Sequence, residues 1–116
     1  MKTHNDLVRA FVDVAVGDGY TDINYDGPGS VQKDFLISLT IDDFTYDIVA
    51  RRNNEYLVAE CETSSCLFSA HTRQQMKHLS QLPFRRFLVV NACDYGRAEA
   101  LLHRLKLRRA ITIVGI

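Results

Sequence analysis

The first periodic stretch of the chain predicts a helix near the N-terminus. Its apolar residues recur every three or four positions and share one face: Leu7, Ala10, Phe11 and Val14. Asn5 or Asp6 is a suitable N-cap, and the helix is expected to run to about Val16. Two glycines within the next three residues then stop it.

The middle of the chain has the shorter period that is typical of β-strands. Three strand-like runs follow one another, at residues 35–41, 45–52 and 56–63. They are separated by Asp42-Asp43 and by Asn53-Asn54, and both pairs suit two-residue hairpin turns. The pattern therefore predicts an antiparallel meander, with a further short strand expected at residues 20–25.

The second half of the chain alternates between helices and strands. We expect helices at residues 67–82 and 97–107, and strands at residues 86–91 and 110–116. The predicted order is αβββαβαβ. A strand, a helix and a strand in succession favour a parallel crossover, so we predict a mixed sheet with helices packed on it, in one α/β domain of residues 1–116.

Composition narrows the class of protein. The chain has 116 residues, 47% hydrophobic and 24% charged, as in an average globular protein. No stretch reaches the roughly 20 apolar residues of a membrane span, and the N-terminus lacks the apolar part of a signal peptide. We expect a soluble cytoplasmic protein with no membrane partner. Cys61, Cys66 and Cys93 have no C-x-x-C spacing and are expected to be reduced, mostly buried thiols.

The formal net charge is zero, but the charges are unevenly distributed along the chain. Residues 1–50 carry three basic side chains and nine aspartates, whereas residues 51–116 carry eleven basic and five acidic side chains. Such segregation is one footprint of a nucleic-acid partner. The alternative is that the last basic residues are only the solvated side of a helix: Arg97, Arg104, Lys106, Arg108 and Arg109.

The Asn53-Asn54 turn fixes the register of its two strands. A two-residue loop places Arg52 opposite Glu55, and counting outward places Asp47 opposite Glu60. Because side chains alternate along a strand, Asp47, Glu60 and Glu62 are expected on one face. The other face is apolar, with Ile48, Ala50, Leu57, Ala59 and Cys61.

Three carboxylates on one face of a hairpin require an explanation, because like charges directly opposite one another destabilise a sheet. A bound Mg²⁺ or Mn²⁺ ion, which prefers hard oxygen ligands, supplies one. The alternative is that the three acids lie at a solvated end of the sheet or pair with arginines. The sequence therefore predicts a metal site formed by Asp47, Glu60 and Glu62.

At these acids the sequence resembles the PD-(D/E)xK nuclease superfamily, which includes many restriction endonucleases, RecB-type nucleases and archaeal Holliday-junction resolvases. The matching text is Tyr46-Asp47-Ile48-Val49, a tight turn, and then Tyr56-Leu57-Val58-Ala59-Glu60-Cys61-Glu62-Thr63. The family core is a helix, a three-stranded meander, a helix and a strand, so the resemblance covers residues 5–91. It implies a restriction-endonuclease-like fold in which Asp47 and Glu60 bind the metal.

The sequence departs from the family at two positions of the motif. Glu62 stands where the family has the lysine that activates or positions the attacking water, and Tyr46 stands where it has proline. Lys33 and Lys77 are candidates for a relocated basic residue. On the second helix, Gln74-x-x-x-His78 is similar to the Gln-x-x-x-Tyr of RecB-type relatives, which implies a catalytic role for Gln74.

The resemblance implies a metal-dependent nuclease acting on DNA in repair, recombination or restriction. In several such families an acid of the first helix joins the site, and Asp6 and Asp13 are the candidates here. Arg85 and Arg86 would contact phosphates together with the last arginines. The alternative is a catalytically silent module that keeps the fold for binding or assembly, for instance as a homodimer paired through the apolar final strand.

Overall fold

A computed structural model describes residues 1–116, and its helices and strands are set out here in chain order. They are α1 (His4–Gly17), β1 (Asp22–Tyr25), β2 (Thr40–Ile41), β3 (Phe44–Thr45), β4 (Ile48–Arg52), β5 (Glu55–Cys61), α2 (Ala70–Leu79), β6 (Arg85–Val90), a short 3-10 helix η1 (Ala92–Asp94), α3 (Tyr95–Arg104) and β7 (Thr112–Gly115).

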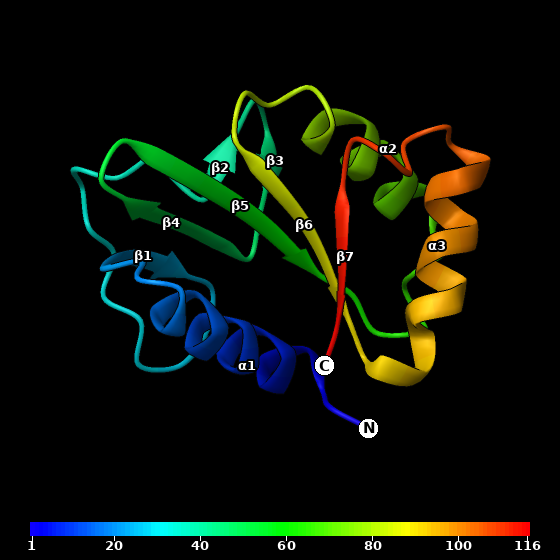
Figure 1. Cartoon of the computed structure of the whole chain (residues 1–116), viewed down its shortest axis with the longest axis horizontal. Coiled ribbons are helices and arrows are strands. Elements are labelled where there is room, and N and C mark those ends of the chain that lie inside the picture. Colours follow the sequence, from blue (N-terminus) through cyan, green and yellow to red (C-terminus); the bar gives the residue numbers. More distant parts are fainter.

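The central feature is a five-stranded mixed sheet in the order β1-β4-β5-β6-β7 (Figure 1). The pairs β1·β4 and β4·β5 are antiparallel, whereas β5·β6 and β6·β7 are parallel. The parallel pairs are connected through α2 and α3, because parallel neighbours need a crossover connection. The predicted α/β class with a mixed sheet is therefore confirmed.

The prediction that residues 35–41 form the first strand of the meander was wrong. Residues 35–41 do not enter the main sheet, and β1 pairs with β4 in their place. Residues 40–45 instead form the separate hairpin β2–β3, closed by Asp42 and Asp43, which both have positive φ as a type I′ turn requires. The reason is that the run at 45–52 is interrupted at Tyr46 and Asp47, so its first part pairs only within this hairpin.

Two apolar cores lie on the two faces of the sheet. The first core joins α1 to one face and contains Leu7, Phe11, Ile48, Ala50, Leu57, Ala59 and Cys61. The second joins α2 and α3 to the other face and contains Val49, Val58, Met76, Leu79, Leu88, Leu101 and Leu102. Each strand supplies both cores because its side chains alternate. The predicted apolar face of the β4–β5 hairpin is the face covered by α1.

The first helix begins two or three residues earlier than the sequence pattern suggests. Thr3 is the N-cap, and its side chain accepts a hydrogen bond from the backbone N–H of Asp6. The Asp6 carboxylate accepts in return from the N–H of Thr3, which completes a capping box. The expectation that Asn5 or Asp6 is the cap was wrong, because Asp6 occupies the third helical position.

The last helix ends in a Schellman motif with a lysine at its left-handed position. The N–H of Lys106 donates to the carbonyl of His103, and the N–H of Leu107 donates to that of Leu102. Lys106 has a φ of 61°. Glycine is the usual residue there because a left-handed conformation costs other L-residues about 1–2 kcal/mol.

None of the helices has the length and hydropathy of a membrane span.

The final strand, β7, lies at one edge of the sheet. Pairing of β7 with a second copy of the chain stays a prediction. Light scattering at high protein concentration tests it, and a strictly monomeric protein would contradict it.

We predict that Lys106→Gly stabilises the fold by about 0.5–1 kcal/mol. The substitution removes the left-handed strain, and this gain exceeds the entropy that glycine adds to the unfolded chain. The urea midpoint measures the change. His103→Gly is the control, because His103 has a helical backbone and the same substitution there should cost about 1 kcal/mol. A Lys106→Gly protein that is less stable than the native chain would contradict the argument.

Candidate functional site

The three predicted acids lie at the carboxyl end of β5. The register of the hairpin is confirmed from Arg52↔Glu55 to Ile48↔Ala59. Asp47 lies one residue beyond this last pair, so it is not a ladder partner of Glu60. Its N–H donates to the carbonyl of Ala59 at 3.2 Å, and its own carbonyl accepts from the N–H of Asp26 at 2.8 Å. Two backbone hydrogen bonds therefore fix Asp47 at the end of the sheet.

All three acids are buried. Asp47 and Glu60 are each 6% exposed and Glu62 is 8% exposed. The carboxyl group of Glu60 lies within hydrogen-bonding range of those of Asp47 and Glu62. Burial raises the pKa of Glu60 well above its ordinary value, and the adjacent Asp47 and Glu62 raise it further. Burial also raises the pKa of Glu62. The three groups therefore resist carrying three negative charges together.

Asp47 is held by partners on both of its oxygens. Its Oδ2 accepts a hydrogen bond from the backbone N–H of Cys61 at 2.8 Å. Its Oδ1 lies 3.0 Å from Nε2 of His4, in the first turn of α1. Because Asp47 lies beyond the ladder, a residue of α1 can reach it around the end of the sheet. His4 is the one basic side chain paired with the three acids.

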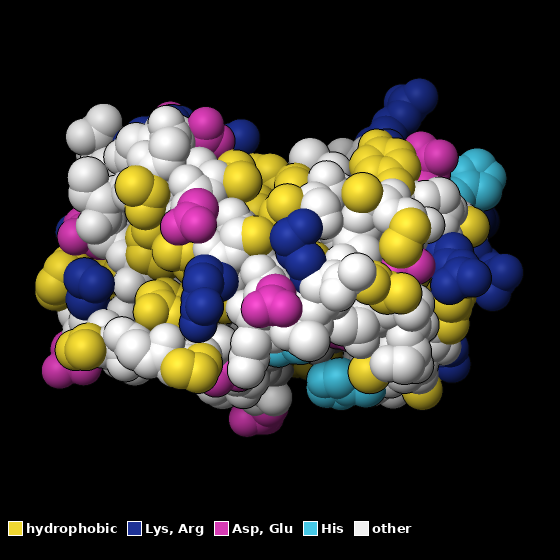
Figure 2. Space-filling view, turned by 90° about the horizontal axis from the view of Figure 1, so that it is seen from below, with side chains coloured by type: hydrophobic (Ala, Val, Ile, Leu, Met, Phe, Trp, Pro, Cys, Tyr) yellow, Lys and Arg dark blue, Asp and Glu magenta, His cyan; other side chains and the backbone are white.

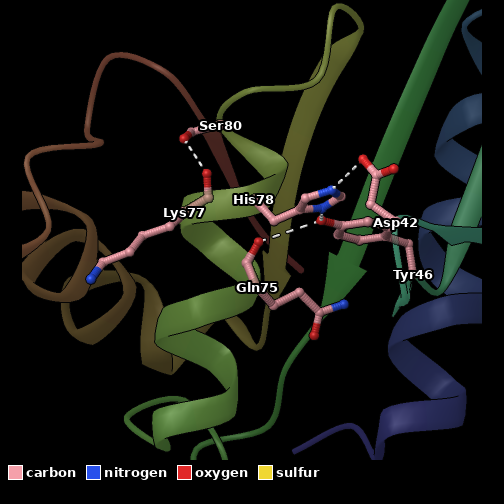
Figure 3. Close-up of polar contacts among 6 residues, drawn as sticks. All are labelled: Asp42, Tyr46, Gln75, Lys77, His78 and Ser80. Atoms are coloured by element: carbon pink, nitrogen blue, oxygen red, sulfur yellow. Dashed lines mark hydrogen bonds and ion pairs between the residues drawn. The ribbon is translucent and has the colours of Figure 1, made fainter.

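The second helix closes the site with polar side chains. Thr72 is buried, its hydroxyl donates to the carbonyl of Cys66 at 2.9 Å, and its proximity favours the charged form of Glu62 and so acts to lower the pKa of that group. Gln75 is fully buried, points from α2 toward the sheet (Figure 3), and donates from Nε2 to the carbonyl of Thr45 at 2.8 Å. Thr72 and Gln75 are three residues apart, so they share one face of α2.

Two buried oxygens here have no hydrogen-bond partner. They are Oε1 of Glu60 and Oε1 of Gln75. Leaving a buried polar group unpaired costs about 1–3 kcal/mol, so such atoms are uncommon in folded proteins. Both oxygens could coordinate a metal ion, because a hard divalent cation prefers oxygen ligands.

A chain of polar side chains fixes the segment that leads into Asp47 (Figure 3). His78 Nε2 lies 3.1 Å from Asp42 Oδ2, and its Nδ1 bonds the hydroxyl of Tyr46. Phe44 stacks on the His78 ring, with centroids 4.6 Å apart. The hairpin β2–β3 is thereby attached to α2, and Tyr46 is immobilised beside Asp47. Burial, together with the charges of Glu60 and Asp42, raises the pKa of Tyr46, so its hydroxyl stays neutral.

The structure separates Gln74 from this cluster. Gln74 is exposed on α2, whereas the buried residues of the helix are Thr72, Gln75, Met76 and Leu79. The expected pairing of Gln74 with His78 at the site is therefore corrected: His78 contacts Tyr46, and Gln75 is the buried glutamine. Neighbouring helical positions differ by 100°, so Gln75 faces the sheet while Gln74 faces solvent.

The other basic and acidic candidates also lie elsewhere. Lys77 is exposed, and the ammonium of Lys33 bonds the carbonyl of Ile23. Asp6 belongs to the capping box of α1, and Asp13 is exposed. No lysine or arginine takes the place of the missing motif lysine, and the first helix contributes His4 in place of an acid.

Arg85 and Arg86 begin β6. The register pairs Arg85 with Leu57 and Arg86 with Val58, three and two residues before Glu60 on β5. The Arg86 guanidinium bonds the carbonyls of Ala110 and Leu82. Its guanidinium is therefore committed to these carbonyls, and contact of Arg85 or Arg86 with a phosphate stays a prediction.

The cysteines differ from expectation in exposure. All three are free, but only Cys61 is buried, while Cys66 and Cys93 are exposed. Burial raises the pKa of Cys61, which keeps its thiol protonated and unreactive. The cluster is therefore a site of carboxylates and one imidazole, without a thiolate.

The residues fit a divalent cation in chemistry, but their donor atoms are not preset around one point. No group of three or more His, Cys, Asp or Glu side chains has a ready metal-binding arrangement. His4 occupies one oxygen of Asp47 and the Cys61 N–H occupies the other. The His4 side chain is 42% exposed, so this pair lies at the solvent-accessible side of the cluster.

Sequence reasoning missed His4 because it depends on where the first turn of α1 meets the sheet. The only available signal was a histidine at the start of an amphipathic helix. That signal does not indicate which strand end the helix approaches.

Comparisons with family models, curated proteins and solved structures gave no match. The site is therefore interpreted from its own chemistry.

We predict that the metal-free protein loses stability as the pH rises. The raised pKa of Glu60 means that the folded state binds this proton more tightly than the unfolded chain does. The contribution is complete below about pH 4.5, the ordinary carboxyl value, and is lost as the pH rises through the higher folded pKa. In Glu60→Gln this loss should disappear, because the amide donates to Asp47 and Glu62 without titrating.

Urea unfolding in EDTA at pH 4.5 and at pH 8 measures the effect. We expect Glu60→Gln to exceed the native protein at pH 8 by about 1–3 kcal/mol, the usual cost of a poorly satisfied buried group. Glu55→Gln, on an exposed part of the same strand, is the control and should keep the native pH dependence. Equal pH slopes for native and Glu60→Gln proteins would contradict the interpretation.

Proposed function

We propose that this protein is a metal-dependent phosphodiesterase of the PD-(D/E)xK type that acts on DNA. The observation that carries the proposal is the unpaired, buried Oε1 of Glu60 between two further carboxyl groups, with no lysine or arginine beside them. A Mg²⁺ or Mn²⁺ ion would satisfy this oxygen and offset the repulsion among the acids.

The order of elements supports the family assignment. The segment α1, β1, β4, β5, α2, β6 consists of a helix, a three-stranded antiparallel meander, a helix and a strand parallel to the last strand of the meander. Asp47 precedes the middle strand of this meander, and Glu60 lies near the end of the third. The β2–β3 hairpin is an addition to this plan.

Each residue has a role that its contacts support. Asp47 and Glu60 would hold the cation, and the buried carboxylate of Glu62 would complete its oxygen ligands. When bound, the cation would offset charge on the scissile phosphate and lower the pKa of a water molecule. His4, the basic side chain at the cluster, would then be the acceptor of a proton from that water, a task that the family gives to a lysine. Its imidazole lies within hydrogen-bonding distance of Asp47, which orients the ring.

The second candidate is a catalytically silent binding or assembly module with the same fold. Two observations favour it. Glu62 replaces the family's lysine, and His4 with the Cys61 N–H already satisfies both oxygens of Asp47. In this case the proton shared by the acids, rather than a cation, offsets their repulsion.

We predict that the purified protein cleaves DNA in Mg²⁺ or Mn²⁺ and not in EDTA. Single-stranded, duplex and branched oligonucleotides are incubated with native protein and with Asp47→Ala, and products are separated on denaturing gels. Removal of Asp47 should lower the rate at least 100-fold, because a ligand and its orientation of His4 are lost together. Asp13→Ala, an exposed acid of α1, should match the native rate. Intact substrates in every lane would favour the silent module.

We predict that Glu62→Gln weakens Mn²⁺ binding by about tenfold or more, because it replaces a charged oxygen donor with a neutral amide. Isothermal titration on the native protein, Glu62→Gln and the exposed control Glu99→Gln measures the affinity. Unchanged affinity in Glu62→Gln would mean that Glu62 is not a ligand. Absence of binding in all three proteins would favour the silent module.

A further inference from the structure

Four basic side chains surround a hollow at the end of α3, remote from the carboxylates. The hollow is about 430 Å³ and is lined only by His103, Lys106, Arg108 and Arg109, without an acidic or apolar residue. We call these four residues the basic groove. Figure 2 shows Lys and Arg side chains along the edge of the molecule that α3 forms, seen from below, so that the end of α3 with the groove faces away from the viewer.

Most of the positive charge in the basic groove is free. Arg108 is paired with Glu99 at 3.3 Å, and its guanidinium also reaches the hydroxyl of Tyr95. His103, Lys106 and Arg109 are in no salt bridge or side-chain hydrogen bond. The charge excess that the sequence places in the second half of the chain is thus concentrated where few acids neutralise it.

The backbone at Lys106 argues against a merely solvated surface. Cations near a helix C-terminus complement its dipole, and this accounts for a basic residue in the last turn of α3. It does not account for lysine at the left-handed position, where glycine is favoured and any side chain is strained. Nor does it account for Arg108 and Arg109, which lie after the helix. Strained residues of this kind are concentrated at functional sites.

We propose that the basic groove binds the phosphate backbone of a nucleic-acid strand. Its chemistry decides among anionic ligands. The groove has no aromatic or apolar wall for a base, so it suits backbone phosphates without sequence preference. It also has no apolar side chain to enter a lipid bilayer, which a membrane-binding surface requires.

The basic groove is separate from the carboxylate site. α3 ends where β7 begins, at the amino ends of the parallel strands, whereas Glu60 and Glu62 lie at the carboxyl end of β5. Through Phe87, the first residue of β7, Thr112, is level with Ala59, so the segment 105–111 and the strands β6 and β7 lie between the groove and the acids. The groove is an anchor for a strand and does not depend on whether the acids cleave.

Fluorescence anisotropy of labelled single-stranded and duplex 20-mers in EDTA tests the proposal. The groove variant is Lys106→Glu with Arg109→Glu. The matched control is Arg9→Glu with Lys77→Glu, which makes the same change in net charge at exposed positions outside the groove. We expect the groove variant to lose at least tenfold in affinity, and the control to stay within about threefold of the native protein.

Lys106→Gly separates binding from folding. This variant keeps or raises the urea midpoint, yet it should reduce the slope of log affinity against log salt by about one phosphate contact. A more stable protein that binds DNA less tightly cannot be explained by misfolding. Equal losses in the groove variant and its control, or no loss in either, would overturn the proposal. Groove-dependent binding to phosphatidylserine vesicles without binding to DNA would overturn it as well.

The two proposals fail separately. Asp47→Ala should bind the oligonucleotides as the native protein does, since it lies outside the basic groove. Groove-dependent binding without cleavage would leave the anchor standing and remove the nuclease. Cleavage that is unaffected by the groove variant would support the nuclease and remove the anchor.

Discussion

Three carboxyl groups buried together without a lysine or arginine beside them are the constraint on which the site depends. Glu60 lies between Asp47 and Glu62, and its raised pKa follows from burial and from these neighbours. A buried charge must be paired, protonated or bound to a metal. The protein can keep this arrangement by sharing a proton or by binding a cation. The shared proton corresponds to the silent module, and the bound cation corresponds to the proposed enzyme.

The position of Asp47 connects the site to the rest of the fold. The residue lies just beyond the β4–β5 ladder, where the backbone of Asp26 and Ala59 fixes it. Tyr46 before it is tied to His78 on α2, and His4 of α1 reaches its carboxylate. Helices from both faces of the sheet therefore contact two adjacent residues, Tyr46 and Asp47. A change in the packing of either helix would therefore shift the position of the Asp47 carboxylate.

The opposite charges of the two ends give the molecule a polarity that its zero net charge conceals. The acids lie at the carboxyl end of β5, and the basic groove lies where α3 ends, near the amino ends of β6 and β7. A strand of nucleic acid anchored at the groove would keep its phosphates away from the acids unless a cation offset their charge. The two ends would then act in sequence, the groove in binding and the acids in chemistry.

The sequence by itself determined the period of each element and the register of the central hairpin. Alternation placed Asp47, Glu60 and Glu62 on one side, and the two-residue turn at Asn53-Asn54 fixed the pairs from Arg52↔Glu55 to Ile48↔Ala59. These features are local, because each depends on residues close in the chain. The exclusion of residues 35–41 from the sheet was not local, since it required β1 to compete for the edge of β4.

Only the tertiary structure decided which residues from other elements meet the acids. His4 arrives from α1 and Gln75 from α2, and their distances in sequence from Asp47 leave no periodic signal. Gln74 and Gln75 differ by one helical step of 100°, and packing of α2 against the sheet decides that Gln75 is the buried one. The basic groove is likewise a product of the Schellman turn, which brings His103 and Lys106 beside Arg108 and Arg109. Local patterns fix which side chains an element presents, whereas packing fixes what they face.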